Sequence, residues 1–188
     1  VIVSQERIAE NKVFIFNNQR QSKHLDAEIK CVPDDKFSVA VSNSVKFVFK
    51  TNEVIVDTPN FRNSINIFLM LRALGLNTDK ELVSAIVWDV DNDKMENVKM
   101  MLRTTLENYK ATCAQHKLKT QEDVLSHLVK ITNFKGINKE IKLSFEDKVE
   151  YLQRSFNIEV LPHLGTSFQK KAHFFGYMAQ KLLKTYLG

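Results

Sequence analysis

The chain contains little cysteine, glycine or proline, and no apolar run long enough to cross a membrane. Its 188 residues include two cysteines, five glycines and three prolines. The cysteines, Cys31 and Cys113, lie far apart and outside any CxxC pair, which argues against a disulfide framework and predicts reduced thiols. The low glycine and proline content excludes collagen-like and low-complexity chains. The sequence therefore predicts a packed, soluble, intracellular domain with no membrane partner.

Motifs that carry bond chemistry are also missing. The sequence has no HExxH or paired Cys/His spacing for zinc, no GxSxG nucleophile elbow and no glycine-rich phosphate loop. The acidic turn Asp89–Asp93 resembles an EF-hand loop, but Lys94 stands where that loop needs glycine and Met100 where it needs glutamate. A simpler interpretation is that Asp91 or Asn92 caps the following helix. We predict no catalytic residue, no metal site and no cofactor in this chain.

Positive charge is concentrated in the last part of the chain. The formal net charge is +5, and residues 111–188 carry 12 basic and 7 acidic side chains, whereas the earlier parts are balanced. A basic surface of this size is typical of one wall of a shared nucleic-acid channel, with a solvated polar face as the alternative. The candidate DNA-contacting lysines form two groups, one around a loop and one on the polar face of the last expected helix: Lys130, Lys135, Lys139, Lys142, and Lys170, Lys181, Lys184.

Patterned segments in the first third predict an antiparallel sheet, because short apolar or alternating runs are bounded by turn residues. Ser42–Ser44 has the composition of a hairpin turn, and Thr58–Asn60 marks the change to helices. The expected strands cover Val13–Phe16, Ala27–Cys31, Phe37–Val41, Val45–Phe49 and Glu53–Asp57. The fold class is therefore α+β in one domain, with residues 1–60 mainly strand and residues 61–188 mainly helix.

The helical part contains several capped, amphipathic segments. Thr78 and Glu81 have the spacing of a capping box, and Thr120 and Ser144 stand where N-caps are expected. The expected helices cover about Asn63–Leu74, a segment after Thr78, Asp93–Asn108, a segment after Thr120, a segment after Ser144, and Ser167–Leu187.

Arg72 interrupts the most apolar of these helices just before Gly75, which can take the left-handed conformation that ends a helix. Two interpretations of Arg72 stay open, a buried ion pair or a phosphate contact at a cleft. In the last helix, Phe174, Tyr177 and Met178 lie beside the main apolar stripe, and Phe174 and Met178 widen it beyond what a surface helix needs. We expect these three residues to pack against another part of a larger assembly.

Three segments resemble one protein family. Residues 65–81, INIFLMLRALGLNTDKE, resemble the motif I-P-I-x-x-x-F-R-A-L-G-x-x-x-D-K-E/D-I in the second-largest subunit of multisubunit DNA-dependent RNA polymerases. Residues 1–11, VIVSQERIAEN, look like the V-I-x-x-Q-E-R/K-x-A-x-N segment of the eukaryotic subunit. The sequences LPHLG at 161–165 and KAHFFGYM at 171–178 are similar to the family's L-P-H and K-A-x-F-L-G-Y-M patterns. The three blocks occur in the family's order, so the resemblance spans the chain.

The resemblance implies the lobe of that subunit, a non-catalytic piece of a longer polypeptide, and the start at valine agrees with a piece. In the family this region forms part of the DNA cleft and docks other subunits and initiation factors. Gln5 and Arg7 are further candidates for non-sequence-specific DNA contact, whereas Arg72, Gly75 and Gly176 are expected to be structural. The parent enzyme, a DNA-directed nucleotidyltransferase, would bind Mg²⁺ elsewhere.

Two expectations concern the origin of the chain and a rival function. Its richness in lysine and asparagine suggests a divergent polymerase from a large DNA virus, located in host cytoplasm or virion, with a nuclear location as the alternative. The rival is a stand-alone protein-interaction module without DNA contact. Its support is the apolar flank around Phe174 and Met178 together with the modest net charge.

Overall fold

The computed structural model describes residues 11–17, 24–32, 39–88, 95–132 and 144–188. Five antiparallel strands pair in chain order, and the helices follow them in the sequence, which confirms the predicted α+β class. The strands are β1 Val13–Asn17, β2 His24–Cys31, β3 Val41–Val48, β4 Glu53–Asp57 and β5 Ile65–Asn66. The helices are α1 Ile67–Ala73, α2 Asp79–Ile86, α3 Glu96–His116, α4 Gln121–Val129, α5 Phe145–Glu159, the 3-10 turn η2 Pro162–Leu164, and α6 Phe168–Leu187.

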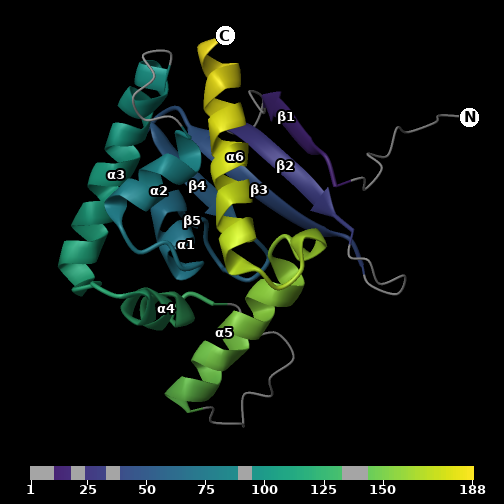
Figure 1. Cartoon of the computed structure of the whole chain (residues 1–188), viewed down its shortest axis with the longest axis vertical. Coiled ribbons are helices and arrows are strands. Elements are labelled where there is room, and N and C mark those ends of the chain that lie inside the picture. The colour runs from purple at the N-terminus through teal and green to yellow at the C-terminus, as the bar shows by residue number, and fades with distance from the viewer. Residues whose placement is uncertain (1–10, 18–23, 33–38, 89–94, 133–143) are drawn as a thin grey trace, which may run out of the picture.

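The described helices that pack on the sheet gather on one of its faces, where α6 crosses β2 and β3 (Figure 1). Alternation along the strands places apolar side chains on this inner face and polar ones on the outer face. In β2 the inner residues Ala27, Ile29 and Cys31 are fully buried, and Val45 and Phe47 continue the layer in β3. The main core therefore lies between the sheet and α6.

The predicted turn at Ser42–Ser44 is wrong, because these residues lie inside β3 and pair with β2. Asn43 falls on the inner face and is fully buried, where its side-chain amide donates to the carbonyl of Glu159 at 3.3 Å. A tertiary hydrogen bond thus overrides the turn preference of asparagine. The chain reverses after β3, between the expected strands Val45–Phe49 and Glu53–Asp57, where Asn52 adopts a left-handed conformation with φ of 50°.

Local capping signals placed most helix starts correctly. Capping boxes are present at Thr78, Thr120 and Ser144. Helix α1 begins later than expected because Ile65 and Asn66 pair with β4 first. Helix α3 extends two turns beyond the predicted end, and the residues predicted to cap it lie outside the described ranges.

Helix α6 approaches α2 very closely at Gly176. A Cβ atom at this position would lie 2.0 Å from the carbonyl oxygen of Ala85, so no side chain fits between the two backbones. One turn later, the Gln180 amide donates to the carbonyl of Ile86 at 2.9 Å and so satisfies a group at the C-terminal end of α2. Gly176 therefore sets the distance at which α6 packs.

A fully buried lysine joins α6 to α5. Lys171 is 0% exposed, and its Nζ donates to the carbonyls of Phe156 at 2.7 Å and Asn157 at 3.1 Å, in the last turn of α5. These bonds satisfy carbonyls that a helix end leaves without partners. Burial lowers the pKa of Lys171 to about 8.

We expect Gly176→Ala to reduce the free energy of unfolding by about 1–3 kcal/mol, because α6 and α2 must move apart to admit the methyl group. Urea unfolding followed by circular dichroism measures the change. Gly165→Ala is the control, since Gly165 has a positive φ of 70° but no atom within 4 Å of an added Cβ, so its cost is conformational alone. Wild-type stability of Gly176→Ala would contradict this packing.

Lys171 predicts a specific dependence of stability on pH. Between pH 8 and the ordinary lysine value the unfolded chain binds more protons at this position than the folded chain, so stability rises with pH in that window. Between about pH 7 and pH 9.5, the free energy of unfolding of the wild type should rise by about 1–2 kcal/mol relative to that of Lys171→Met. Urea unfolding measures both values. Lys170→Met, which removes an exposed neighbouring lysine, is the control and should keep the wild-type profile. A Lys171→Met profile parallel to wild type would refute the assignment.

Candidate nucleic-acid interface

Three of the candidate lysines lie on one side of α6, because positions 170, 181 and 184 recur at helical spacing. Lys170 and Lys184 are exposed, and Tyr177 lies half-buried between them. Lys181 is less available, since its Nζ lies 3.5 Å from the carbonyl of Val13 and ties α6 to the edge strand β1. The exposed side of α6 therefore presents the ammonium groups of Lys170 and Lys184.

Lys130 belongs to a different surface. It is exposed and caps the C-terminal end of α4, which lies at the opposite end of the molecule from the C-terminal end of α6 (Figure 1). It neighbours His127, whose ring centroid is 4.4 Å from that of His116. Burial lowers the pKa of His127, and the neighbouring charges of His116 and Lys130 lower it further.

Lys130, the member of the loop group that the structure describes, therefore lies apart from the lysines of α6. The remaining candidates fall outside the described residues, so no position is assigned to them: Gln5, Arg7, Lys135, Lys139 and Lys142.

Arg72 anchors α1 to its neighbours through hydrogen bonds. Its guanidinium donates to the hydroxyl of Tyr109 in α3 at 3.2 Å and to the carbonyl of Lys119 before α4 at 2.5 Å. Within the described ranges these contacts, and no ion pair, are its partners. Arg72 is therefore bound to two neutral acceptors where an ion pair was one expectation. These bonds use two of the guanidinium N–H donors that a phosphate contact would need. Burial raises the pKa of Tyr109 to about 12.

Gly75 ends α1 in the way its sequence position indicates. Its φ is 104°, its N–H donates to the carbonyl of Arg72 at 3.0 Å, and the next N–H, that of Leu76, donates to Leu71 at 3.2 Å. This is the Schellman pattern, which satisfies the last carbonyls of a helix. The turn directs the chain into the capping box of α2.

The apolar flank of α6 differs from the one expected. Met178 is fully buried inside this chain, because it faces the core rather than the surface, so it cannot contact a partner. Phe174 and Tyr177 are half-buried, and their ring centroids lie 5.8 Å apart. Trp88, which the sequence analysis did not single out, is 63% exposed and stacks on Tyr177 at 6.2 Å. The flank is therefore aromatic and centred on Trp88 and Tyr177.

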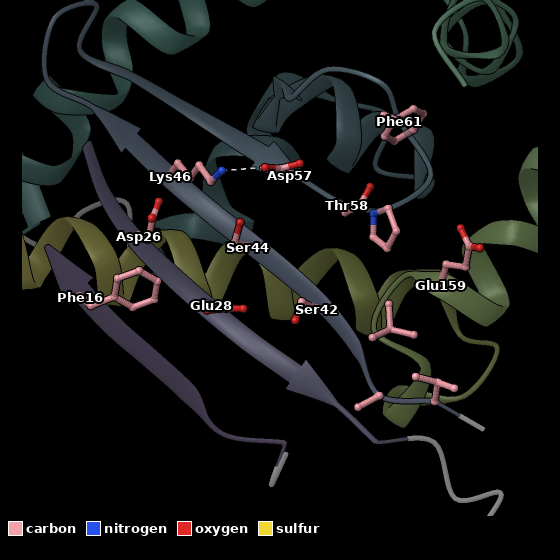
Figure 2. A pocket seen from close by; sticks show the side chains of 14 residues that line it. Phe16, Asp26, Glu28, Ser42, Ser44, Lys46, Asp57, Thr58, Phe61 and Glu159 are labelled. Carbon is pink, nitrogen blue, oxygen red and sulfur yellow. Dashed lines mark hydrogen bonds and ion pairs between the residues drawn. The ribbon is translucent and has the colours of Figure 1, made fainter. Parts of the chain in front are cut away.

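The outer face of the sheet carries an open pocket of about 740 Å³ (Figure 2). Asp26 and Lys46 are direct partners across β2 and β3, and Lys46 pairs with Asp57 at 2.6 Å. Asp26 is only 4% exposed, and burial raises the pKa of its carboxyl. The sequence analysis did not single out Asp26, Lys46 or Asp57 and so missed this pocket.

Two further findings concern the described part of the chain. It contains no group of three or more His, Cys, Asp or Glu side chains placed to hold a metal ion. Within the same ranges, every helix is too short or too polar to cross a membrane.

Comparison with known proteins decides the family. The family described as RNA polymerase Rpb2, domain 2, matches residues 9–188. The chain belongs to this family. Its relatives include DNA-directed RNA polymerase II subunit RPB2 of Encephalitozoon cuniculi and DNA-directed RNA polymerase subunit 2 of Acanthamoeba polyphaga mimivirus, each 30% identical over the whole chain. The archaeal subunit Rpo2 of Saccharolobus solfataricus is 26% identical, also over the whole chain.

The domain spans 15% or 16% of the length of these relatives. The family confirms the resemblance that the three sequence blocks carry, and it assigns the fold to domain 2 of a second-largest polymerase subunit. The relatives are cellular and viral alike, so a viral origin stays a prediction.

Replacing Arg72 should destabilise the domain through lost hydrogen bonds. We expect Arg72→Met to cost about 2 kcal/mol in unfolding free energy, because a buried hydroxyl and a carbonyl lose a charged donor. The matched control is Arg103→Met, which removes an 81% exposed arginine paired with Glu107 one turn away and should cost less than about 0.5 kcal/mol. Equal effects of the two substitutions in urea unfolding would remove the anchoring role from Arg72.

Proposed function

We propose that this domain is the lobe of a DNA-directed RNA polymerase, where it forms part of the wall of the DNA cleft and a docking surface for other subunits and initiation factors. It contributes no catalytic group and acts inside the cell through position, shape and charge. The transferase chemistry and its Mg²⁺ would reside elsewhere in the polymerase. The observation that carries the proposal is the family match over residues 9–188.

The exposed side of α6 is the surface best suited to DNA among the described residues. Lys170 and Lys184 are 14 positions apart, which corresponds to about 21 Å along a helix. Both side chains are exposed, so they can approach two phosphates that lie several nucleotides apart on a duplex lying along α6. Contacts of this kind position DNA without reading its sequence.

The rival function, protein interaction without DNA, is favoured by one observation. Trp88 is exposed and stacked on Tyr177, and paired aromatic side chains of this kind are enriched in protein interfaces. Because Tyr177 lies on the same helix as the lysines, a protein partner would cover part of the proposed DNA surface. The two functions therefore predict different effects of the same lysine substitutions.

The double variant Lys170→Gln/Lys184→Gln should weaken binding of the chain to a fluorescent duplex and reduce its salt dependence. The plot of log binding constant against log salt concentration should become shallower by about 2, because each lost phosphate contact removes about 0.9 from the slope. Fluorescence anisotropy at several salt concentrations measures both quantities. Lys80→Gln, an exposed lysine on α2, is the charge control. A salt slope unchanged from that control would favour the rival function.

A further inference from the structure

The sheet ends on one side in a strand whose outer edge is open. Strand β1 pairs with β2 along its whole length and, among the described residues, with no other strand (Figure 1). The opposite margin ends in β5, which has two residues and contacts α3, where the Asn66 amide donates to the carbonyl of Thr105 at 2.9 Å. An edge strand presents a row of backbone N–H and C=O groups that can pair with another chain. Strand β1 is therefore the long free edge of the described sheet.

Strand β1 lacks the features that protect edge strands from pairing. Its sequence, VFIFN, contains no charged residue, proline or glycine. Phe14, opposite Glu28 in the register, is 40% exposed. Before the strand begins, the side-chain oxygen of Asn11 accepts from the backbone N–H of Val32 at 2.7 Å, which holds the start of β1 near the end of β2. The edge is thus fixed in an extended conformation before any partner arrives.

The apolar layer under the sheet is incomplete at this edge. Val13 lies opposite Ile29 on the inner face. Ile15 lies opposite Ala27 on the same face. Both β2 residues are 0% exposed, whereas the two β1 residues pack against the core but stay half-buried. A further strand beside β1 covers them with its own inward side chains, and these must be apolar for the burial to be favourable.

The charge beside the edge is positive. Helix α6, which packs against β1, contains no aspartate or glutamate. Nζ of Lys181 lies 3.5 Å from the carbonyl of Val13, so an ammonium group stands next to β1 itself. An acidic side chain at the end of an added strand is attracted to this group, whereas a basic one is repelled.

We propose that the open edge of β1 binds an extended segment of a partner protein, which adds to the sheet as a sixth strand. Main-chain hydrogen bonds to β1 supply affinity, and alternate apolar side chains cover Val13 and Ile15. An acidic residue at one end of the segment pairs with Lys181. The inference rests on the docking role proposed above and names the chemistry of the docked partner.

The probe is the peptide acetyl-EVTVTVE amide, which has valine at alternate positions and glutamate at each end. It is titrated into the isotope-labelled 188-residue chain and followed by backbone amide chemical shifts and hydrogen exchange. We expect saturable shifts in β1 and slower exchange of those β1 amides that do not bond to β2. A peptide with glutamine at both ends should bind about two- to fivefold more weakly at low salt. Equal binding of the two peptides would overturn the assignment of an acidic partner.

Two N-methylated versions of the peptide test strand addition itself. One carries N-methyl groups on the valines and the other on the threonines, whose N–H groups face opposite edges of an extended strand. The version methylated on the edge that faces β1 should bind at least about tenfold more weakly than the parent peptide, because its main-chain donors are blocked. The other version should bind within about threefold of the parent peptide. Loss of binding in both versions, or in neither, would overturn the proposal.

A substitution in β1 links the binding to the edge. Ile15→Lys places an ammonium group on the inner face in the middle of β1, where an added strand would bury it, and should weaken binding at least about tenfold. Ile158→Lys makes the same change at a 67% exposed position on α5 and should bind the peptide as the wild type does. Amide spectra show whether each variant folds, and the N-methylated peptides test the wild type independently.

Three further outcomes would overturn the proposal: no binding, shifts confined to other surfaces, or slow exchange of the outward β1 amides before peptide is added. The last would mean that the chain itself, or a second copy of it, already occupies the edge. Duplex binding through α6 is measured separately by the anisotropy experiment above, so the two proposals can fail independently.

Discussion

The close approach of α6 to both the sheet and α2 is the constraint on which the rest of the structure depends. Helix α6 covers the inner face of β2 and β3, and Gly176 lets its backbone meet the carbonyl of Ala85. Close packing of this kind transmits any added volume to the neighbouring elements, since interiors have few voids. The distance at which α6 packs against the sheet and α2 therefore determines how α1, α2 and the sheet are placed relative to one another.

Buried polar side chains hold the ends of the helices around this core. Gln180 satisfies a carbonyl at the end of α2, Lys171 does so at the end of α5, and Arg72 links α1 to the segment before α4. Each removes a helix-end carbonyl or loop carbonyl from the set of unpaired groups that burial would make costly. These hydrogen bonds specify which helix end lies against which element. Apolar packing alone specifies this less well, because apolar contacts are not directional.

Two chemically different surfaces result from this arrangement. Lys170 and Lys184 are exposed on α6, which packs on the inner face of the sheet (Figure 1), whereas the pocket around Asp26 opens on the outer face (Figure 2). The exposed lysines of α6 and the pocket around Asp26 therefore lie on different faces of the domain.

The sequence by itself determined the elements and the family. Capping boxes at Thr78, Thr120 and Ser144, and the glycine stop at Gly75, were readable because their hydrogen bonds join residues a few positions apart. The motif order likewise identified a polymerase subunit, which the family match confirms.

Only the tertiary structure decided which polar residues are buried and which apolar ones are exposed. Asn43 looked like a turn residue but bonds to Glu159, 116 positions away, and Met178 looked exposed but lies in the core. The pocket around Asp26 is lined by residues from several strands and from the segment after β4, which are distant in the sequence. Burial depends on contacts between segments that are distant in the sequence, and a local pattern of residues does not predict those contacts.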